Sequence, residues 1–243
     1  MKCNFIGGTD PGLVRSNNQD DYYIDKSEQR YCIVADGMGG HAGGQEASQI
    51  AVDAIRTFLD KNWGASEPTE LLLKEALLKA NDAILQDQAQ HPERSDMGTT
   101  LVMFAYRKSQ FWVAHVGDSR CYLLREKTLE QVTDDHTWVA RAMRSGDLTA
   151  EQAKNHPWRH VLSKCLGRKD INAEQIEVNE LGIQEGDRLL LCSDGLTEEV
   201  PDNDINELLS QSDTNKVIAQ LIETAKDNGG KDNITVVIAE IVA

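Results

Sequence analysis

The sequence has no long hydrophobic run and few basic residues relative to acidic ones. No apolar stretch approaches the roughly 20 residues that a membrane-spanning helix needs, and no basic-then-apolar signal segment opens the chain. Lysine and arginine number 25 against 40 aspartates and glutamates, which gives a net charge of −15. A surface of this sign repels the phosphates of nucleic acid. We therefore expect a cytoplasmic protein that binds neither membranes nor nucleic acid.

Paired cysteines are also lacking. The five cysteines are an odd number and form no C-x-x-C motif, and three of them lie inside apolar, strand-like runs. This pattern favours buried, reduced thiols over disulfides or a zinc site. The cysteines are Cys3, Cys32, Cys121, Cys165 and Cys192.

Short β-rich runs alternate with helical stripes of apolar residues. Two helical stripes, within 47–58 and 73–84, follow each other without a strand between them, which does not fit regular β-α-β alternation. An α+β sandwich, with antiparallel sheets covered by helices, fits better. The predicted strands are Tyr31–Ala35, Thr100–Tyr106, Phe111–Val116, Cys121–Arg125, Arg188–Cys192 and Ile234–Ile241.

No repeat, low-complexity stretch or long linker divides the chain, so residues 1–243 are expected to form a single domain. The segment from about 137 to 169 is polar, contains Gly146 and Pro157, and shows no clear strand. We interpret it as a mobile excursion beside the functional site.

Aspartates stand at the ends of four strand-like runs. Asp36-Gly37, Gly117-Asp118 and Asp194-Gly195 follow predicted strands, whereas Asp232-Asn233 precedes one. Antiparallel strands bring both kinds of end to one edge of a sheet, so the four carboxylates could converge. Convergent oxygen ligands select Mg²⁺, Mn²⁺ or Ca²⁺ over zinc.

Each of these pairs is, by itself, a common turn sequence. The segment Val116–Arg120, between two predicted strands, is the clearest hairpin, although Asp118 within it fits a ligand as well. Asp36-Gly37 is different because it opens a glycine-rich loop, 38–44, that leads to a helix. Close backbone approach to a metal or a phosphate would explain those glycines.

The same loop raises a competing interpretation. Gly37-x-Gly39-x-x-Ala42, after a strand and before a helix, matches a relaxed dinucleotide-binding fingerprint. Against it, Asp36 would sit beside a pyrophosphate, and the next segment is a second helix where a Rossmann unit needs a parallel strand.

Taken together, seven motifs in order along nearly the whole chain resemble those of the PPM family, the PP2C-type metal-dependent protein phosphatases. They are Arg15-Ser16-Asn17-Asn18-Gln19-Asp20, Val34-Ala35-Asp36-Gly37-Met38-Gly39-Gly40-His41, Met97-Gly98-Thr99-Thr100, His115-Val116-Gly117-Asp118-Ser119-Arg120, Thr133-Asp134-Asp135-His136, Leu191-Cys192-Ser193-Asp194-Gly195-Leu196-Thr197 and Gly230-Lys231-Asp232-Asn233-Ile234-Thr235.

The resemblance implies a PP2C-like four-layer α-β-β-α sandwich of two antiparallel sheets flanked by helices, with a flap at about 137–169. It also implies hydrolysis of phosphoserine and phosphothreonine in proteins by metal-activated water, with two or three Mn²⁺ or Mg²⁺ ions. The implied metal ligands are Asp36, the carbonyl of Gly37, Asp194, Asp232 and, for a third ion, Asp118.

Three further residues take catalytic roles by the same resemblance. Arg15 would bind the phosphate, since a guanidinium grips two oxygens at once. Asp20 would orient the attacking water, and His41 would serve as the proton donor. A structural role for His41 in ordering its loop is the alternative. Gln19 stands where many eukaryotic members carry glutamate, whereas bacterial relatives often have Asn or Gln there.

The implied partners are phosphorylated proteins, including a cognate bacterial Hanks-type serine/threonine kinase, and we expect a monomer. A link to type VI secretion is a looser expectation. Two alternatives stay open: a pseudophosphatase that binds phosphoproteins as a regulatory module, and an anti-sigma-antagonist phosphatase of the same superfamily.

Overall fold

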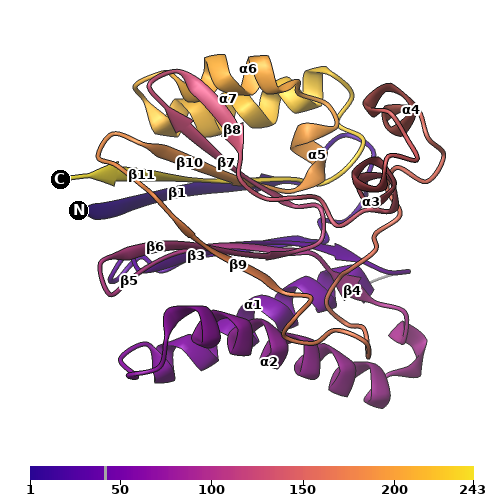
Figure 1. Ribbon diagram of the computed structural model, residues 1–243. Coiled ribbons are helices and arrows are strands. Elements are labelled where there is room, and N and C mark those ends of the chain that lie inside the picture. The colour runs from indigo at the N-terminus through magenta and orange to yellow at the C-terminus, as the bar shows by residue number, and fades with distance from the viewer. Residues whose placement is uncertain (41–42) are drawn as a thin grey trace.

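Two antiparallel sheets lie face to face, and each is covered by helices on its outer side (Figure 1). The computed structural model describes residues 1–40 and 43–243. The proposed proton donor His41 therefore lies outside the described residues. The first sheet has the strand order β1 (Lys2–Asp10), β11 (Ile234–Val242), β10 (Arg188–Cys192), β7 (Arg120–Arg125) and β8 (Thr128–Gln131).

The second sheet is built from the middle of the chain. Its order is β2 (Asp20–Ile24), β3 (Tyr31–Met38), β5 (Leu101–Arg107), β6 (Gln110–Val116) and β9 (Glu177–Leu181), with the short β4 (Gly98–Thr99) paired to β3. Helices α1 (Gly43–Asn62) and α2 (Thr69–Gln90) cover this sheet, and a 3₁₀ turn (Pro92–Arg94) follows them. Helices α6 (Asp202–Leu209) and α7 (Thr214–Asp227) cover the first sheet, with the short α5 (Asp194–Thr197) at its end.

Three apolar layers hold the four structural layers together. Strand β3 shows why its sequence is a continuous apolar run. Tyr31, Ile33 and Ala35 pack toward α1 and α2, whereas Cys32 and Val34 pack into the layer between the sheets. Both faces of the strand are thus removed from water, and no polar alternation is left. The predicted α+β sandwich, including its four-layer form, is confirmed.

Two local predictions were wrong. Val116–Arg120 is not a hairpin, because β6 belongs to the second sheet and β7 to the first, so this segment crosses between the sheets. Asp36-Gly37 does not open a loop either, since β3 continues to Met38, with Gly37 paired to Thr99. Strands β1, β2, β4, β8 and β9 were not predicted. They are short, glycine-containing or polar on one or both faces.

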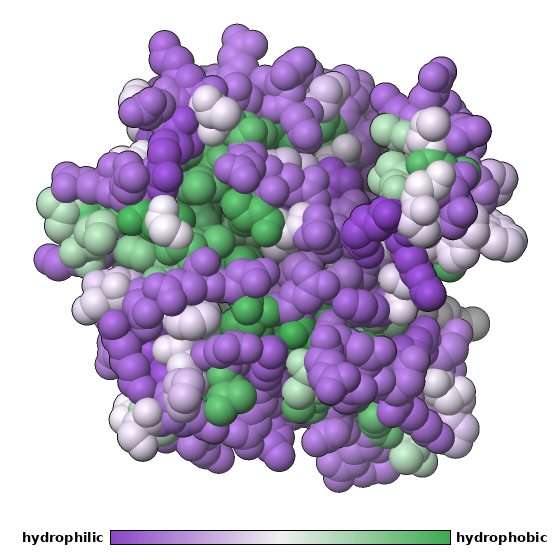
Figure 2. Space-filling view, in the orientation of Figure 1, coloured by the Kyte–Doolittle hydropathy of each residue, from purple (hydrophilic) through white to green (hydrophobic). Residues whose placement is uncertain are grey.

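The flap segment, defined as residues 137–169, contains two short helices, α3 (Trp138–Ser145) and α4 (Ala150–Lys154). Thr137 caps α3 by accepting a hydrogen bond from the N–H of Ala140, and Gly146 ends it in a left-handed conformation. An isolated bridge joins Thr137 to Leu162. Figure 2 shows a lobe on the right of the view, where Figure 1 places α3 and α4. Within the ranges 1–40 and 43–243, no helix has the length and apolarity to cross a membrane.

Candidate metal centre

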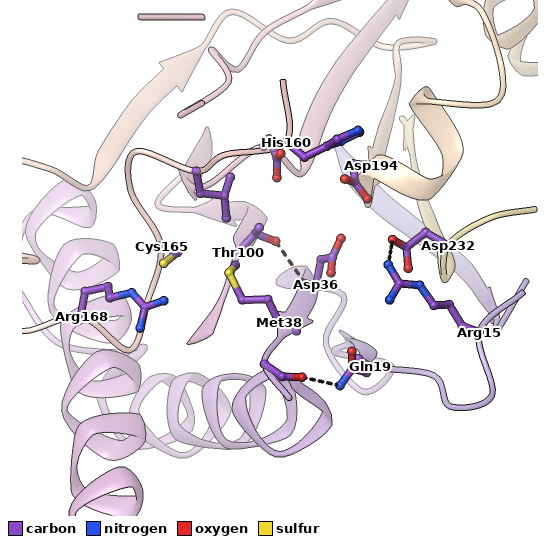
Figure 3. Close-up of a pocket in the computed structure, with 14 residues that line it drawn as sticks. Arg15, Gln19, Asp36, Met38, Thr100, His160, Cys165, Arg168, Asp194 and Asp232 are labelled. Atoms are coloured by element: carbon purple, nitrogen blue, oxygen red, sulfur yellow. Dashed lines mark hydrogen bonds and ion pairs between the residues drawn. The ribbon is translucent and has the colours of Figure 1, made fainter. Parts of the chain in front are cut away.

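The structure brings the four strand-end aspartates to one cleft. Asp36, Asp118, Asp194 and Asp232 all line a depression of about 390 Å³ at one end of the sandwich. Figure 3 shows Asp36, Asp194 and Asp232 pointing toward a common space. Asp36 comes from β3 in the second sheet, and Asp194 and Asp232 from the ends of β10 and β11 in the first. Asp118 lies on the crossing between the sheets, so the cleft joins both of them.

Asp36 is held firmly through its backbone. Its N–H donates to Thr100 Oγ1 at 3.1 Å, and its carbonyl accepts from the Thr99 hydroxyl at 2.9 Å. The following residue must be glycine, because a Cβ atom on Gly37 would lie 2.0 Å from the carbonyl oxygen of Gly44. The start of α1 therefore packs directly on the strand end.

Asp20 lies directly opposite Asp36 in the β2–β3 register and is 8% exposed. One carboxylate oxygen accepts a hydrogen bond from Ser193 Oγ at 2.8 Å, whereas the other, Oδ1, is buried and has no hydrogen-bond partner among the described residues. Burial raises the pKa of Asp20 to about 7, and the nearby Asp194 and Asp232 carboxylates add to this effect. An orphaned, buried oxygen of this kind points to a missing donor or cation.

The pKa values of the other buried carboxyls are also raised. Burial is the main cause for Asp36, Asp118 and Asp194. Repulsion between neighbours adds to it: Asp194 repels both Asp36 and Asp118, and Asp232 repels Asp194. Without a cation these groups destabilise one another. The oxygen donors fit Mg²⁺ or Mn²⁺, and bound ions would neutralise the repulsion.

Arg15 enters the cleft from the loop between β1 and β2. Its Nη2 donates to Asp232 Oδ2 at 2.7 Å (Figure 3). Asn233 holds this loop in place, since its amide donates to the carbonyls of Pro11 and Asn17, both at 3.0 Å, and its Oδ1 accepts from the Gln19 N–H at 2.7 Å. The sequence analysis treated Asn233 only as a turn residue. Its place directly after Asp232 was the available signal.

Four flap residues also line the cleft, and the sequence analysis gave none of them a role there: His160, Leu162, Cys165 and Arg168. His160 lies beside Asp194, with its Nδ1 2.5 Å from a carboxylate oxygen of Glu198. Arg168 lies across the cleft from Arg15 (Figure 3). His160 belongs to none of the sequence motifs, and only the folding of the flap segment brings it to the carboxylates. The five cysteines are all buried and unpaired.

A cleft of converging carboxylates, set between two antiparallel sheets and flanked by arginines, is a site for divalent cations and an anionic ligand. The model of the protein phosphatase 2C family matches residues 14–238. The chain belongs to this family.

Named relatives and solved structures agree with this assignment. The serine/threonine protein phosphatase PstP of Mycobacterium tuberculosis is 39% identical over 244 residues, which are 100% of this chain and 46% of PstP. This chain thus spans about half the length of that relative. The serine/threonine phosphatase stp of Listeria monocytogenes is 37% identical, over 96% of this chain and 93% of stp. The catalytic domain of PstP in complex with two manganese ions superimposes with a TM-score of 0.88 at 35% identity, covering 99% of both chains.

Proposed function

We propose that this chain is a metal-dependent protein phosphatase that removes phosphate from phosphoserine and phosphothreonine. The observation that carries the proposal is the convergence of Asp36, Asp118, Asp194 and Asp232 in one cleft together with Arg15. A cluster of carboxylates repels a phosphate unless cations are bound, and bound cations turn the same cluster into a phosphate site. The names of the similar proteins support the same activity.

The proposed ligands are those that the sequence suggested. Asp36, the Gly37 carbonyl, Asp194 and Asp232 would hold two ions, and Asp118 together with Asp194 would hold a third. Two or three Mn²⁺ or Mg²⁺ ions would supply an activated water and neutralise phosphoryl charge. The manganese complex of the similar PstP domain supports this choice of metals.

The protein groups around the ions would orient the reactants. Asp20 has a buried carboxylate oxygen that no described residue hydrogen-bonds, and this oxygen would accept a hydrogen bond from the attacking water. Arg15 would exchange its contact with Asp232 for two phosphate oxygens. The proton donor for the leaving alkoxide stays open between His41, which lies outside the described residues, and His160, which lines the cleft.

A second cavity, which adjoins the first cleft, favours a protein as the substrate. It has a volume of about 440 Å³ and shares Asp118, His160 and Asp194 with the first cleft. Its walls are the flap helices α3 and α4 on one side and α5 on the other. A phosphorylated side chain that reaches the carboxylates would leave its flanking polypeptide over this cavity.

The alternatives have less support. Every predicted ligand aspartate is present, which disfavours a pseudophosphatase. The antiparallel sheets and the consecutive helices α1 and α2 do not form the parallel unit of a dinucleotide-binding fold. Phosphoproteins as substrates follow from the proposed activity. The anti-sigma-antagonist alternative, a cognate kinase, a link to type VI secretion and a monomeric state stay predictions.

Release of inorganic phosphate from a phosphothreonine peptide tests the proposal. The purified chain with Mn²⁺ should release phosphate, and Asp36→Asn should release none above background. A wild-type protein that binds the peptide without hydrolysing it would favour the pseudophosphatase. Near-native activity in Asp36→Asn would contradict the assignment of the site.

A further inference from the structure

One motif from the sequence, Thr133-Asp134-Asp135-His136, contributes no carboxylate to the proposed ion ligands. It lies instead against the crossing segment that carries Asp118. His136 and Gly117 form a reciprocal pair: the N–H of His136 donates to the Gly117 carbonyl at 3.0 Å, and the N–H of Gly117 donates to Nδ1 of His136 at 3.1 Å. The residue that follows Gly117 is Asp118, so this pair fixes the peptide from which the carboxylate extends.

Two other residues of the motif, Thr133 and Asp135, hold the part of the segment that follows Asp118. Arg120 donates from Nε and Nη2 to the two carboxylate oxygens of Asp135, at 2.9 and 2.7 Å. Thr133 Oγ1 accepts from the N–H of Cys121 at 3.0 Å. The crossing segment is therefore clamped before and after Asp118. Gly117 adopts φ = 109°, and a Cβ atom there would lie 2.5 Å from Thr100. Glycine fits this backbone conformation because it has no Cβ atom.

The tautomer of His136 follows from these contacts. A backbone N–H can only donate, so Nδ1 must present its lone pair to Gly117. In the neutral ring the proton is then on Nε2, which donates to Glu177 Oε1 at 2.8 Å. The ring is 1% exposed and stacks on His115 with 4.7 Å between ring centroids. Glu177 thus holds the imidazole in the one tautomer that accepts from Gly117.

The same network reaches the flap segment. Lys164 Nζ lies 3.3 Å from Glu177 Oε1, and the N–H of Ser163 donates to the carbonyl of His136 at 2.8 Å. Both residues stand where the chain returns from the flap. His136 therefore links the base of the flap to the peptide before Asp118.

A metal site is a poorer explanation of this cluster. His115, His136 and Glu177 place donor atoms within 4.8 Å of one another. However, His115 Nε2 is engaged with the carbonyl of Asp134 at 2.9 Å, and the Lys164 ammonium lies 3.4 Å from His136 Nε2. A cation there would have to break the first contact and face the positive charge of the second.

We propose that His136 is a positioning residue: fixed by Glu177, it sets the Gly117–Asp118 peptide and so determines how tightly a divalent ion is held at Asp118. This inference rests on the metal centre proposed above. Partners of this kind, which orient a metal ligand without binding the metal, typically change metal affinity about 10- to 100-fold when they are removed.

Two substitutions of His136 separate positioning from packing. In His136→Asn the side-chain carbonyl reaches about as far as Nδ1 and can still accept from Gly117. In His136→Gln the amide reaches about as far as Nε2, so it keeps the contact with Glu177 and loses the one with Gly117. Both remove the ring that stacks on His115, and both should lower the thermal stability by similar amounts.

The measurement is calorimetric titration of the metal-free full chain with Mn²⁺. Wild type and Asp118→Asn are compared first, and a site lost in Asp118→Asn defines the ion at Asp118. That ion should bind about tenfold or more weakly in His136→Gln, and nearly as in wild type in His136→Asn. Glu177→Ala should weaken binding of this ion as well. Glu180→Ala should not, because Glu180 is an exposed residue of the same strand whose side chain accepts a hydrogen bond from Gln110 and lies outside the His136 network.

Equal Mn²⁺ affinities in wild type, His136→Gln and Glu177→Ala would overturn the inference. Equal losses in His136→Asn and His136→Gln would also overturn it, because they would reflect packing alone. If His136→Gln does not fold, Glu177→Ala and Glu180→Ala test the inference: weaker Mn²⁺ binding in Glu177→Ala alone supports it, and equal binding in the two variants overturns it. The phosphopeptide assay on wild type reports separately on the proposed function, so a failure there is distinguishable from a failure at His136.

Discussion

Arg15 and Asp232 bind each other across the cleft, with Nη2 2.7 Å from Oδ2, although we propose phosphate for one and a cation for the other. The pair is partly exposed, with 52% and 35% of the side chains accessible, so it contributes little to stability. In the proposed site the pair would instead shield Asp232 until a cation takes the place of Arg15, and the guanidinium would then be free to bind the phosphate.

Substitution of Arg15 should therefore separate substrate binding from metal binding. Arg15→Ala should lower kcat/KM for a phosphothreonine peptide roughly 10- to 100-fold, since charge-assisted hydrogen bonds contribute about 1.5–3 kcal/mol. Its Mn²⁺ affinity should be equal to or tighter than that of wild type, because no arginine competes for Asp232. Arg15→Lys keeps the positive charge but cannot donate to two phosphate oxygens from one planar group. Its kcat/KM should therefore fall between those of wild type and Arg15→Ala. A weaker Mn²⁺ affinity in Arg15→Ala would contradict this account.

Asp36 should destabilise the metal-free protein. Burial and the neighbouring carboxylates raise its pKa well above the value in an unfolded chain, so this cost grows as the pH rises above about 4. In EDTA at pH 7, Asp36→Asn should be more stable to urea than wild type, and the gain should shrink toward pH 4. Mn²⁺ should stabilise wild type more than the variant. A variant that is less stable than wild type in EDTA at pH 7 would refute this explanation.

His136 should make the stability depend on pH in the opposite direction. Burial, and then the neighbouring His115, lowers the pKa of His136 to about 4, from an ordinary value of 6.5. The unfolded chain thus binds the proton first as the pH falls, and the contribution of His136 is complete above 6.5 and is lost toward 4. The advantage of wild type over His136→Asn in EDTA should shrink by roughly 2–3 kcal/mol between pH 7 and 4.5. Both proteins carry the same aspartates, so subtracting one free energy of unfolding from the other cancels the pH dependence that the aspartates contribute. A constant difference would argue against a buried neutral ring.

The second cavity, which the flap helices α3 and α4 line, should affect turnover of peptides but not of small phosphate esters. Lys154 and Arg159 line it, and neither side chain makes an ion pair within the part of the chain that the structure describes. The double variant Lys154→Glu, Arg159→Glu should lower kcat/KM for peptides with acidic flanking residues roughly three- to tenfold, as expected for exposed charges. Turnover of p-nitrophenyl phosphate should not change. Lys61→Glu, on α1 of the other sheet, is the matched control. An equal effect on both substrates would contradict a role in peptide binding.

The sequence was sufficient to predict the layers and the convergence of aspartates for a physical reason. Asp36 lies near the end of a strand that is apolar on both faces, and Asp194 and Asp232 flank two further strands of this kind. In this sandwich these strand ends meet at one edge. The prediction failed where pairing is not local. Nothing between Val116 and Arg120 shows that β6 and β7 enter different sheets, because the sheet of each strand is set by a distant partner, β9 for β6 and β10 for β7.

The supporting residues of the site were harder to predict. Ser193, Asn233 and His136 act through hydrogen bonds to residues 173, 214 and 19 positions away, respectively, and such contacts leave no periodic pattern. His160 reaches the cleft only because the flap segment folds back over α5. In each case the residue type fits several roles, and the fold selects one of them.

Metal dependence of phosphate release tests the central claim most directly. The purified chain is stripped with EDTA, assayed on a phosphothreonine peptide, and assayed again after Mn²⁺ or Mg²⁺ is restored. The account predicts no turnover in EDTA and full recovery with the cation, with Asp36→Asn inactive throughout. Phosphate release at an unchanged rate in EDTA would contradict it.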